Sequence, residues 1–141
     1  MAAVSNSTRD VVVEIYDAYA RGDLAHVASF IDDDIEWIIE APIQIFQFAG
    51  ARKGRAAVLE AMQGIGQKYE LKSYVPEIIV VEGDRAAVMS NTSFIQRATG
   101  RVIRVRLANF LRFRNGRVIE FREFANTFDL VEQTLGREFD L

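Results

Sequence analysis

The sequence predicts an α+β fold in which helices cover one face of a curved antiparallel sheet. Two observations support this fold class. The first half of the chain carries three segments with apolar residues at helical spacing, and the second half carries four strand-like segments of about 10 residues each, separated by glycines. Helices followed by consecutive strands are typical of α+β folds. Helices packed against a curved sheet are expected to enclose a cone-shaped central pocket.

Composition indicates one globular domain, residues 1–141, and excludes several classes of function. Half of the residues are hydrophobic, which is enough for a real core. Lys and Arg number 17 against 20 Asp and Glu, and the arginines of the last third alternate with glutamates, so we expect no nucleic-acid partner. No apolar run reaches the length of a membrane span, and residues 1–10 are polar. We therefore expect no membrane partner and a cytoplasmic location.

Cysteine and histidine usage limits the cofactors. The chain has no cysteine and a single histidine, His26. Thiol catalysis is excluded, and so is a metal site built from several histidines. We expect neither a metal nor another cofactor, and we place His26 on the surface of the second helix.

The first helix is predicted from a capping box. Ser7 precedes Asp10 by three residues, and apolar residues then recur at helical spacing until Gly22 ends the helix. The residues expected on its inner stripe are Val12, Ile15, Tyr16 and Tyr19.

The second helix should be short and should lead into a strand. Asp23 is a suitable N-cap, and the apolar stripe of the helix runs to Ile31 before the aspartates 32–34 close it in a polar turn. A short strand, Ile35–Ile39, follows, with Trp37 at its centre. Trp37 should face the helices or the pocket.

The remaining elements follow from proline and glycine positions. Pro42 begins an irregular stretch that contains Phe46 and Phe48, which could form a lid, and a third helix follows Gly54. The expected strands are Tyr69–Val81, Arg85–Arg97, Arg101–Phe113 and Val118–Asn126. Phe128–Leu135 should form a short closing helix.

The register of the last hairpin decides which polar residues face the core. The pair Asn115-Gly116 marks the turn. A two-residue turn would place Arg114 opposite Arg117 and carry charges into the core. A three-residue loop with a bulge instead places Phe113 opposite Arg117 and sorts the two faces cleanly, so we adopt it.

In that register the inner face carries only two polar residues, Asn109 and Glu123. Asn109 is expected opposite Phe121, and Glu123 opposite Leu107. The apolar residues of this face are Ile103, Val105, Leu107, Leu111, Phe113, Ile119, Phe121 and Ala125. The outer face carries Arg104, Arg106, Arg112, Glu120 and Arg122 together with Phe110 and Phe124.

These motifs, in this order, resemble the SnoaL-like, ketosteroid-isomerase-related branch of the nuclear transport factor 2-like superfamily, over nearly the whole chain. The matching stretches are Tyr16-x-x-Tyr19-Ala20-Arg21-Gly22-Asp23-Leu24, Asp33-Asp34-Ile35-Glu36-Trp37, Gly50-x-x-x-Gly54-Arg55, Phe113-x-x-Gly116-Arg117-Val118 and Arg122-Glu123-Phe124. The resemblance implies a cystatin-like sheet folded round an apolar pocket, commonly in a homodimer built through the convex sheet face.

The machinery of the best-studied relative is matched only in part. The tyrosine, the aspartate base and the protonated aspartic acid of ketosteroid isomerase fall on Ile15, Ile39 and Asn109. A small shift would bring Tyr16 and Glu40 into the first two places. Steroid isomerisation is therefore disfavoured.

Two other relatives match the end of the last strand. The Trp-Arg-Asp-Tyr of limonene-type epoxide hydrolase is mirrored by residues 121–124, which retains one carboxylate, Glu123. SnoaL-like cyclases often place an aspartate or histidine after this strand, where Asn126 stands here.

The strongest candidates for catalytic residues are Glu123, Asn109 and Tyr16. Burial among apolar side chains would raise the pKa of Glu123 into the range useful for acid or base work, unless Glu123 is a structural residue paired with an arginine. Asn109, helped by Tyr16 or Tyr19, could donate to a carbonyl or enolate oxygen. The expected substrate-binding residues are Trp37, Tyr19, Glu40, Phe46, Phe48, Leu107, Phe121, Ala125 and Asn126.

Two functions fit this pattern. The first is a cofactor-independent enzyme that isomerises, cyclises or dehydrates a hydrophobic small molecule by proton transfer through Glu123. The alternative is a binding or accessory module of the same fold with no turnover. Convergence of Glu123 and Asn109 on one closed cavity favours the enzyme, whereas a binder needs only the shape of the cavity.

Overall fold

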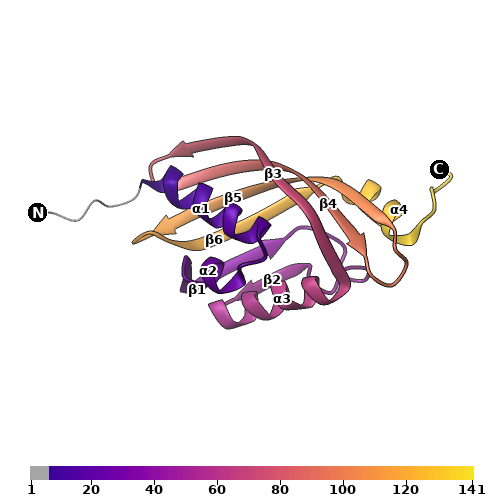
Figure 1. The fold of residues 1–141 in the computed structure, drawn as a ribbon, viewed down its shortest axis with the longest axis horizontal. Helices are drawn as coiled ribbons and strands as arrows, with labels where there is room; N and C mark the ends of the chain where they lie inside the picture. The colour runs from indigo at the N-terminus through magenta and orange to yellow at the C-terminus, as the bar shows by residue number, and fades with distance from the viewer. Residues whose placement is uncertain (1–6) are drawn as a thin grey trace, which may run out of the picture.

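The computed structural model describes residues 7–141 and confirms the α+β fold class, with a six-stranded curved sheet (Figure 1). The strands are β1 (Ile31–Ile39), β2 (Gly50–Lys53), β3 (Tyr69–Glu82), β4 (Arg85–Gln96), β5 (Val102–Arg114) and β6 (Arg117–Ala125). The helices are α1 (Thr8–Ala20), α2 (Leu24–Ala28), α3 (Arg55–Lys68) and α4 (Thr127–Leu135). Of the polar opening segment, residues 1–6 lie outside the described part.

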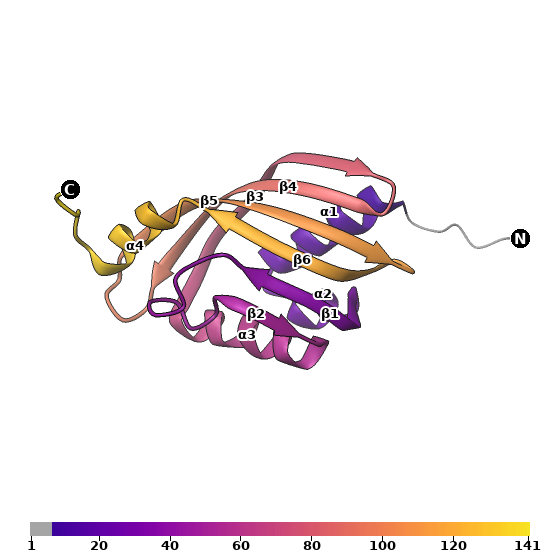
Figure 2. The same ribbon diagram turned by 180° about the vertical axis from the view of Figure 1, so that it is seen from behind.

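The sheet has the order β2-β1-β6-β5-β4-β3. Its neighbouring strands are antiparallel except β1, which runs parallel to β6 and so differs from a purely antiparallel sheet. Helices α1, α2 and α3 lie on one side of the sheet, and the view from behind shows the strands in front of them (Figure 2). The main core fills the space between these helices and the concave face.

The first helix begins as predicted. The hydroxyl of Ser7 accepts a hydrogen bond from the backbone N–H of Asp10, and the carboxylate of Asp10 accepts one from the N–H of Ser7, which completes the capping box. Gly22 follows the helix with a φ of 74°. Because Val12 and Tyr16 are buried, α1 is held against the sheet by its inner stripe.

The predicted boundary between the second helix and the first strand is wrong. Strand β1 begins at Ile31 rather than Ile35, so the aspartates 32–34 belong to the strand and not to a turn. Pairing with β6 explains this difference, because Ile31 lies opposite Val118 and Glu36 opposite Glu120, which keeps the segment between them extended. Cationic side chains from other elements also contact the aspartates. Arg114 lies 3.0 and 3.5 Å from the first and third aspartates, and Arg55 lies 2.6 Å from the second. Tertiary pairing therefore overrides the local preference of aspartate for turns.

The predicted loop of the last hairpin is also wrong. Arg114 pairs with Arg117, so the turn has two residues. Asn115 and Gly116 both adopt positive φ, 52° and 74°, which is the backbone of the turn that Asn-Gly favours.

A β-bulge beyond the turn shifts the register of β6 against β5 by one residue. Phe113 pairs with Val118, but Arg112 pairs with Glu120, which leaves Ile119 as an extra residue on β6. From there on the register differs from the predicted one by two residues. A shift of two keeps side chains on their faces, so the predicted faces of β5 and of β6 from Glu120 onward are confirmed by their burial. Ile119 is the exception, because the bulge puts Val118 opposite Phe113 in the core instead.

Strand β2 was not predicted. It has four residues, two of them charged, and carries no apolar alternation that would indicate a strand. It forms because Trp37 of β1 pairs with Arg52, which extends the sheet by one strand. Strands β3 to β6 and helix α4 begin and end within two residues of their predicted positions, and α3 follows Gly54 as predicted.

Gly54 links β2 to α3 in a conformation that favours glycine, with φ 93° and ψ 148°. Its N–H donates to the carbonyl of Ile35 at 2.8 Å. We expect Gly54→Ala to lower the free energy of unfolding by about 1–3 kcal/mol, because a side chain there is strained. Gly64 lies inside α3, where a Cβ would meet nothing within 4 Å, so Gly64→Ala should raise it by about 1 kcal/mol.

Urea unfolding of the two glycine variants provides the measurement. Their midpoints should move in opposite directions from that of the parent protein. A Gly54→Ala variant as stable as Gly64→Ala would contradict the assigned strain.

Candidate functional site

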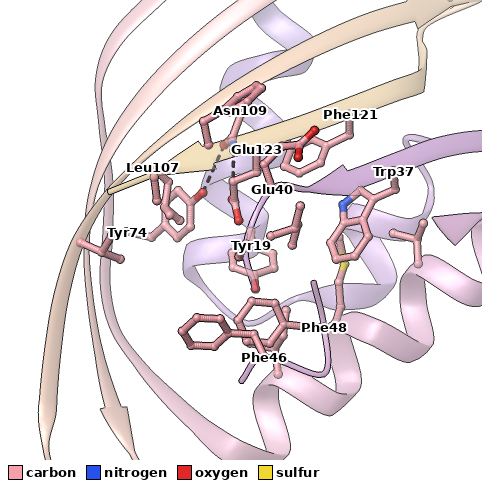
Figure 3. Close-up of a pocket in the computed structure, with 18 of the residues that line it drawn as sticks. Tyr19, Trp37, Glu40, Phe46, Phe48, Tyr74, Leu107, Asn109, Phe121 and Glu123 are labelled. Atoms are coloured by element: carbon pink, nitrogen blue, oxygen red, sulfur yellow. Dashed lines mark hydrogen bonds between the residues drawn. The ribbon is translucent and has the colours of Figure 1, made fainter. Parts of the chain in front are cut away.

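An apolar cavity of about 150 Å³ lies between the helices and the concave face of the sheet (Figure 3). A cavity of this volume with apolar walls is large enough for a benzene-sized molecule. The residues that were expected to bind substrate and that line it are Trp37, Tyr19, Glu40, Phe46, Phe48, Leu107, Phe121 and Ala125.

Aromatic rings make up much of the cavity wall. Trp37 of β1 stacks on Phe121 of β6 with ring centroids 6.0 Å apart, because the parallel pairing of these strands sets the two residues side by side. Phe46 and Phe48 come from the irregular stretch after Pro42 and pack together with ring centroids 5.4 Å apart. This stretch therefore closes part of the cavity with aromatic side chains.

Of the residues expected to bind substrate, Glu40 lies at the rim of the cavity and Asn126 lies outside it. Glu40 lines the cavity, but its side chain is 47% exposed and lies 3.9 Å from Arg122, which places it at the rim. Asn126 does not line the cavity. Its side chain accepts a hydrogen bond from the backbone N–H of Asp129 and caps α4. The spacing of Asn126 and Asp129 is a capping signal that sequence reasoning could have used.

A cluster of polar side chains lies at the sheet side of the cavity. Asn109 pairs directly with Glu123 across β5 and β6, and its amide N–H donates to the Glu123 carboxylate at 3.0 Å. The amide oxygen of Asn109 accepts from the hydroxyls of Tyr16 at 2.6 Å and Tyr74 at 3.3 Å. Figure 3 shows the Glu123 carboxylate above Tyr19, between Tyr74 and Trp37.

Tyr74 was missed by sequence reasoning. It lies on β3, whose pairing with β4 shifts register twice, once before Tyr74 and once after Pro76. These irregularities break the alternation of the strand, so the inner residues cannot be read off by counting in twos. Tyr74 also packs edge to face on Tyr19 with ring centroids 5.4 Å apart.

Burial sets the proton affinities of the cluster. It raises the pKa of Glu123 from its ordinary value of 4.5 to about 7, and the hydrogen bond from Asn109 opposes part of this rise. Burial, and then the nearby charge of Glu123, raise the pKa of Tyr19 to about 12. The same two causes raise the pKa of Tyr16 well above its usual value. The tyrosines are therefore protonated hydrogen-bond donors at neutral pH.

Polar atoms of Glu123 and Tyr19 remain open to a ligand in the cavity. Within residues 7–141, neither the second carboxylate oxygen of Glu123 nor the hydroxyl of Tyr19 has a protein hydrogen-bond partner. Glu123 also has no ion-pair partner in this part of the chain. The arrangement can therefore exchange a proton at Glu123 while Tyr19 donates a hydrogen bond.

The described residues contain neither a membrane-spanning helix nor a metal-binding cluster. Between residues 7 and 141, every helix is too short or too polar to span a membrane. The same residues contain no group of three or more His, Cys, Asp or Glu side chains that could hold a metal ion. His26 lies 2.8 Å from Glu14, in a contact between α2 and α1.

Comparison with known families assigns the chain. Residues 12–121 match the model of the SnoaL-like domain family. The chain belongs to the SnoaL-like domain family. No curated protein matches this SnoaL-like chain significantly.

Solved structures share the fold of this SnoaL-like protein. A protein from Rhodopseudomonas palustris, provisionally described as an isomerase, is 38% identical, with a TM-score of 0.83 over 95% of this chain and 100% of that one. An NTF2-like protein of unknown function from Burkholderia pseudomallei is 21% identical, with a TM-score of 0.83 over 92% and 98%. A hypothetical protein of ketosteroid isomerase-like fold from Catenulispora acidiphila, in complex with trimethylamine, is 13% identical, with a TM-score of 0.77 over 94% and 96%.

Proposed function

We propose that this SnoaL-like protein, as a single domain over residues 1–141, is a cofactor-independent enzyme of isomerase or lyase type. It would move a proton on a neutral hydrophobic small molecule. The observation that carries the proposal is Glu123, a carboxyl group inside an apolar cavity whose pKa is raised to about 7. A group with this pKa can both take and return a proton near neutral pH, which isomerisation, cyclisation and dehydration all require. The provisional description of the 38% identical protein as an isomerase supports the same class of reaction.

The proposed role of each residue follows from whether its polar atoms already have hydrogen-bond partners in the protein. Glu123 removes a proton next to a carbonyl group, and the Tyr19 hydroxyl donates to the oxygen on which charge develops. Asn109 is only 1% exposed and already bonds Tyr16, Tyr74 and Glu123, so we assign it to orienting the Glu123 carboxylate rather than to contacting substrate. Tyr16 holds Asn109 in place.

Deuterium incorporation tests the proposal without knowledge of the natural substrate. One-ring ketones such as cyclohexanone and acetophenone fit the size of the cavity, and loss of their α-proton signals in D2O is followed by NMR. We expect the protein to accelerate exchange above the rate in the same buffer, with an apparent pKa near 7 for the group responsible.

The second candidate is a binding module for the same kind of ligand. The observation in its favour is that Tyr16, Tyr74 and Asn109 satisfy one another, which leaves few donors for a substrate oxygen. A structure of the same fold holds trimethylamine, so a small ligand alone is compatible with this fold. Saturable ketone binding with no exchange above the buffer rate would replace the enzyme by this function.

We also propose a homodimer through the outer face of the sheet. Phe110 of β5 and Phe124 of β6 are 53% and 42% exposed, and their rings meet edge to face at 6.1 Å. Exposed aromatic pairs of this kind are enriched at protein interfaces. The double variant Phe110→Ser, Phe124→Ser should sediment as a monomer, whereas Val13→Ser, at a position 50% exposed on α1, should stay dimeric. A parent protein that sediments as a monomer would contradict this interface.

A further inference from the structure

We propose that the cavity also binds a small hydrophobic amine in its protonated form, with the Glu123 carboxylate as counter-ion. This inference rests on the proposed function in one respect: an ammonium ion paired with Glu123 would occupy the group that moves the proton. Such an amine would therefore be an inhibitor of proton transfer.

The charges around the cavity favour a cationic ligand. No Lys, Arg or His side chain of residues 7–141 lines it, and Arg122, the next residue to Glu123 on β6, pairs with Glu40 at the rim. The titratable groups that line it with Glu123 are Tyr16, Tyr19, Tyr69, Tyr74 and Glu40. At neutral pH the tyrosines are uncharged and Glu40 is paired with Arg122, so the charge inside the cavity is the negative charge of ionised Glu123. Anionic ligands are repelled and a cation is attracted.

The desolvation of Glu123 also favours a cationic ligand. An ionised carboxylate in apolar surroundings is costly unless a cation accompanies it, and the hydrogen bond from Asn109 offsets that cost only in part. A protonated amine would reach the carboxylate oxygen that has no partner. The ion pair forms from two charges that each lose water, so it needs further favourable contacts to be stable.

The aromatic walls supply those contacts. Tyr19 and Tyr74 lie near the Glu123 carboxylate, and Trp37 lines the same cavity farther away (Figure 3). Faces of aromatic rings attract ammonium ions and their alkyl substituents, and the attraction grows when water is excluded. With a volume of about 150 Å³, the cavity suits an amine that carries one ring or a compact branched chain.

Proton balance gives the binding a distinctive pH dependence. An alkylamine keeps its proton to about pH 10, as the lysine side chain does. Below about pH 7 Glu123 holds a proton that must leave when the ammonium ion binds, so affinity for the amine rises with pH and levels off above 7. A neutral ligand of the same shape favours the protonated carboxyl, and its affinity should fall as pH rises through 7.

Calorimetric titration of the full chain with benzylamine and benzyl alcohol at pH 5.5 and 7.5 tests the proposal. We expect benzylamine affinity to rise at least about tenfold between these pH values, and benzyl alcohol affinity to stay level or fall. In Glu123→Gln the rise for benzylamine should disappear while benzyl alcohol still binds, which also shows that the variant is folded. Glu120→Gln is the matched control. Glu120 lies on the same strand as Glu123 but on the outer face of the sheet, where it pairs with Arg112 of β5.

Other results separate this inference from the proposed function. Equal binding of benzylamine and benzyl alcohol at both pH values, or a Glu120→Gln variant that loses the effect as Glu123→Gln does, would overturn it. A protein that binds benzylamine as described but never accelerates ketone exchange would retain the ammonium site and lose the proposed enzyme. Ketone exchange that benzylamine inhibits at pH 7.5 but much less at pH 5.5 would support both.

Discussion

Glu123→Gln should lower the rate of ketone proton exchange by about 10²–10⁴-fold, the usual contribution of a positioned general base. Glutamine has the shape of glutamate and can still accept the hydrogen bond from Asn109, but it cannot take a proton. Affinity for the neutral ketone should therefore stay within about twofold of the parent value. NMR exchange rates and calorimetric affinities, measured on the same preparations, check the two parts of this expectation.

An unchanged exchange rate in Glu123→Gln would remove the catalytic role of this residue. A large loss of ketone affinity together with the rate would instead indicate a collapsed cavity. The control is Glu120→Gln, which removes a carboxylate from the same strand without entering the cavity, and which should exchange at the parent rate.

The same variant should also reveal the stability cost of the raised pKa. Between the ordinary value of 4.5 and about 7, the unfolded chain has released the Glu123 proton while the folded chain still holds it, so stability falls as pH rises across this range. The total loss is up to about 3 kcal/mol at pH 8. Glu123→Gln cannot ionise, so it should match the parent near pH 4.5 and exceed its stability at pH 8.

Asn109→Leu should destabilise the fold by about 2–5 kcal/mol, because several buried polar groups lose their partner at once. The hydroxyls of Tyr16 and Tyr74 lose their acceptor, and Glu123 loses a donor. Loss of that donor also favours the neutral carboxyl, so the pKa of Glu123 should rise further. Urea unfolding at pH 6 and a titration of the glutamate carboxyl signals by NMR provide the two measurements.

Asn109→Asp is the informative control for the leucine variant. A protonated aspartic acid can accept from Tyr16 and Tyr74 and donate to Glu123, so at low pH the variant should lose little stability. As pH rises, two carboxyl groups in hydrogen-bond contact compete for protons, and stability should fall more steeply than in the parent. A leucine variant as stable as the parent, or an aspartate variant with no added pH dependence, would show that the cluster does not support the site.

Elements that depend on neighbouring residues were predictable from the sequence. The capping box at Ser7 and the helical stripe that carries Tyr16 involve side chains within a few residues of each other. The inner faces of β5 and β6 were also predictable, because alternation along a strand is local and survives an error of two residues in register. These features placed Asn109, Glu123 and Tyr16 on surfaces that face one another across the core.

The contacts among those residues depended on the tertiary structure. The bulge at Ile119 moves Glu123 opposite Asn109, and the register shifts of β3 bring Tyr74 to the same amide. A bulge arises where twist, packing and pairing with neighbouring strands must be reconciled, and no single residue type signals its position. The sequence by itself thus determined the fold class, the family and the faces, while only the folded chain decided which side chains bond each other. The physical reason is that faces follow from local periodicity, whereas register and burial, and with them the raised pKa of Glu123, follow from contacts between distant segments.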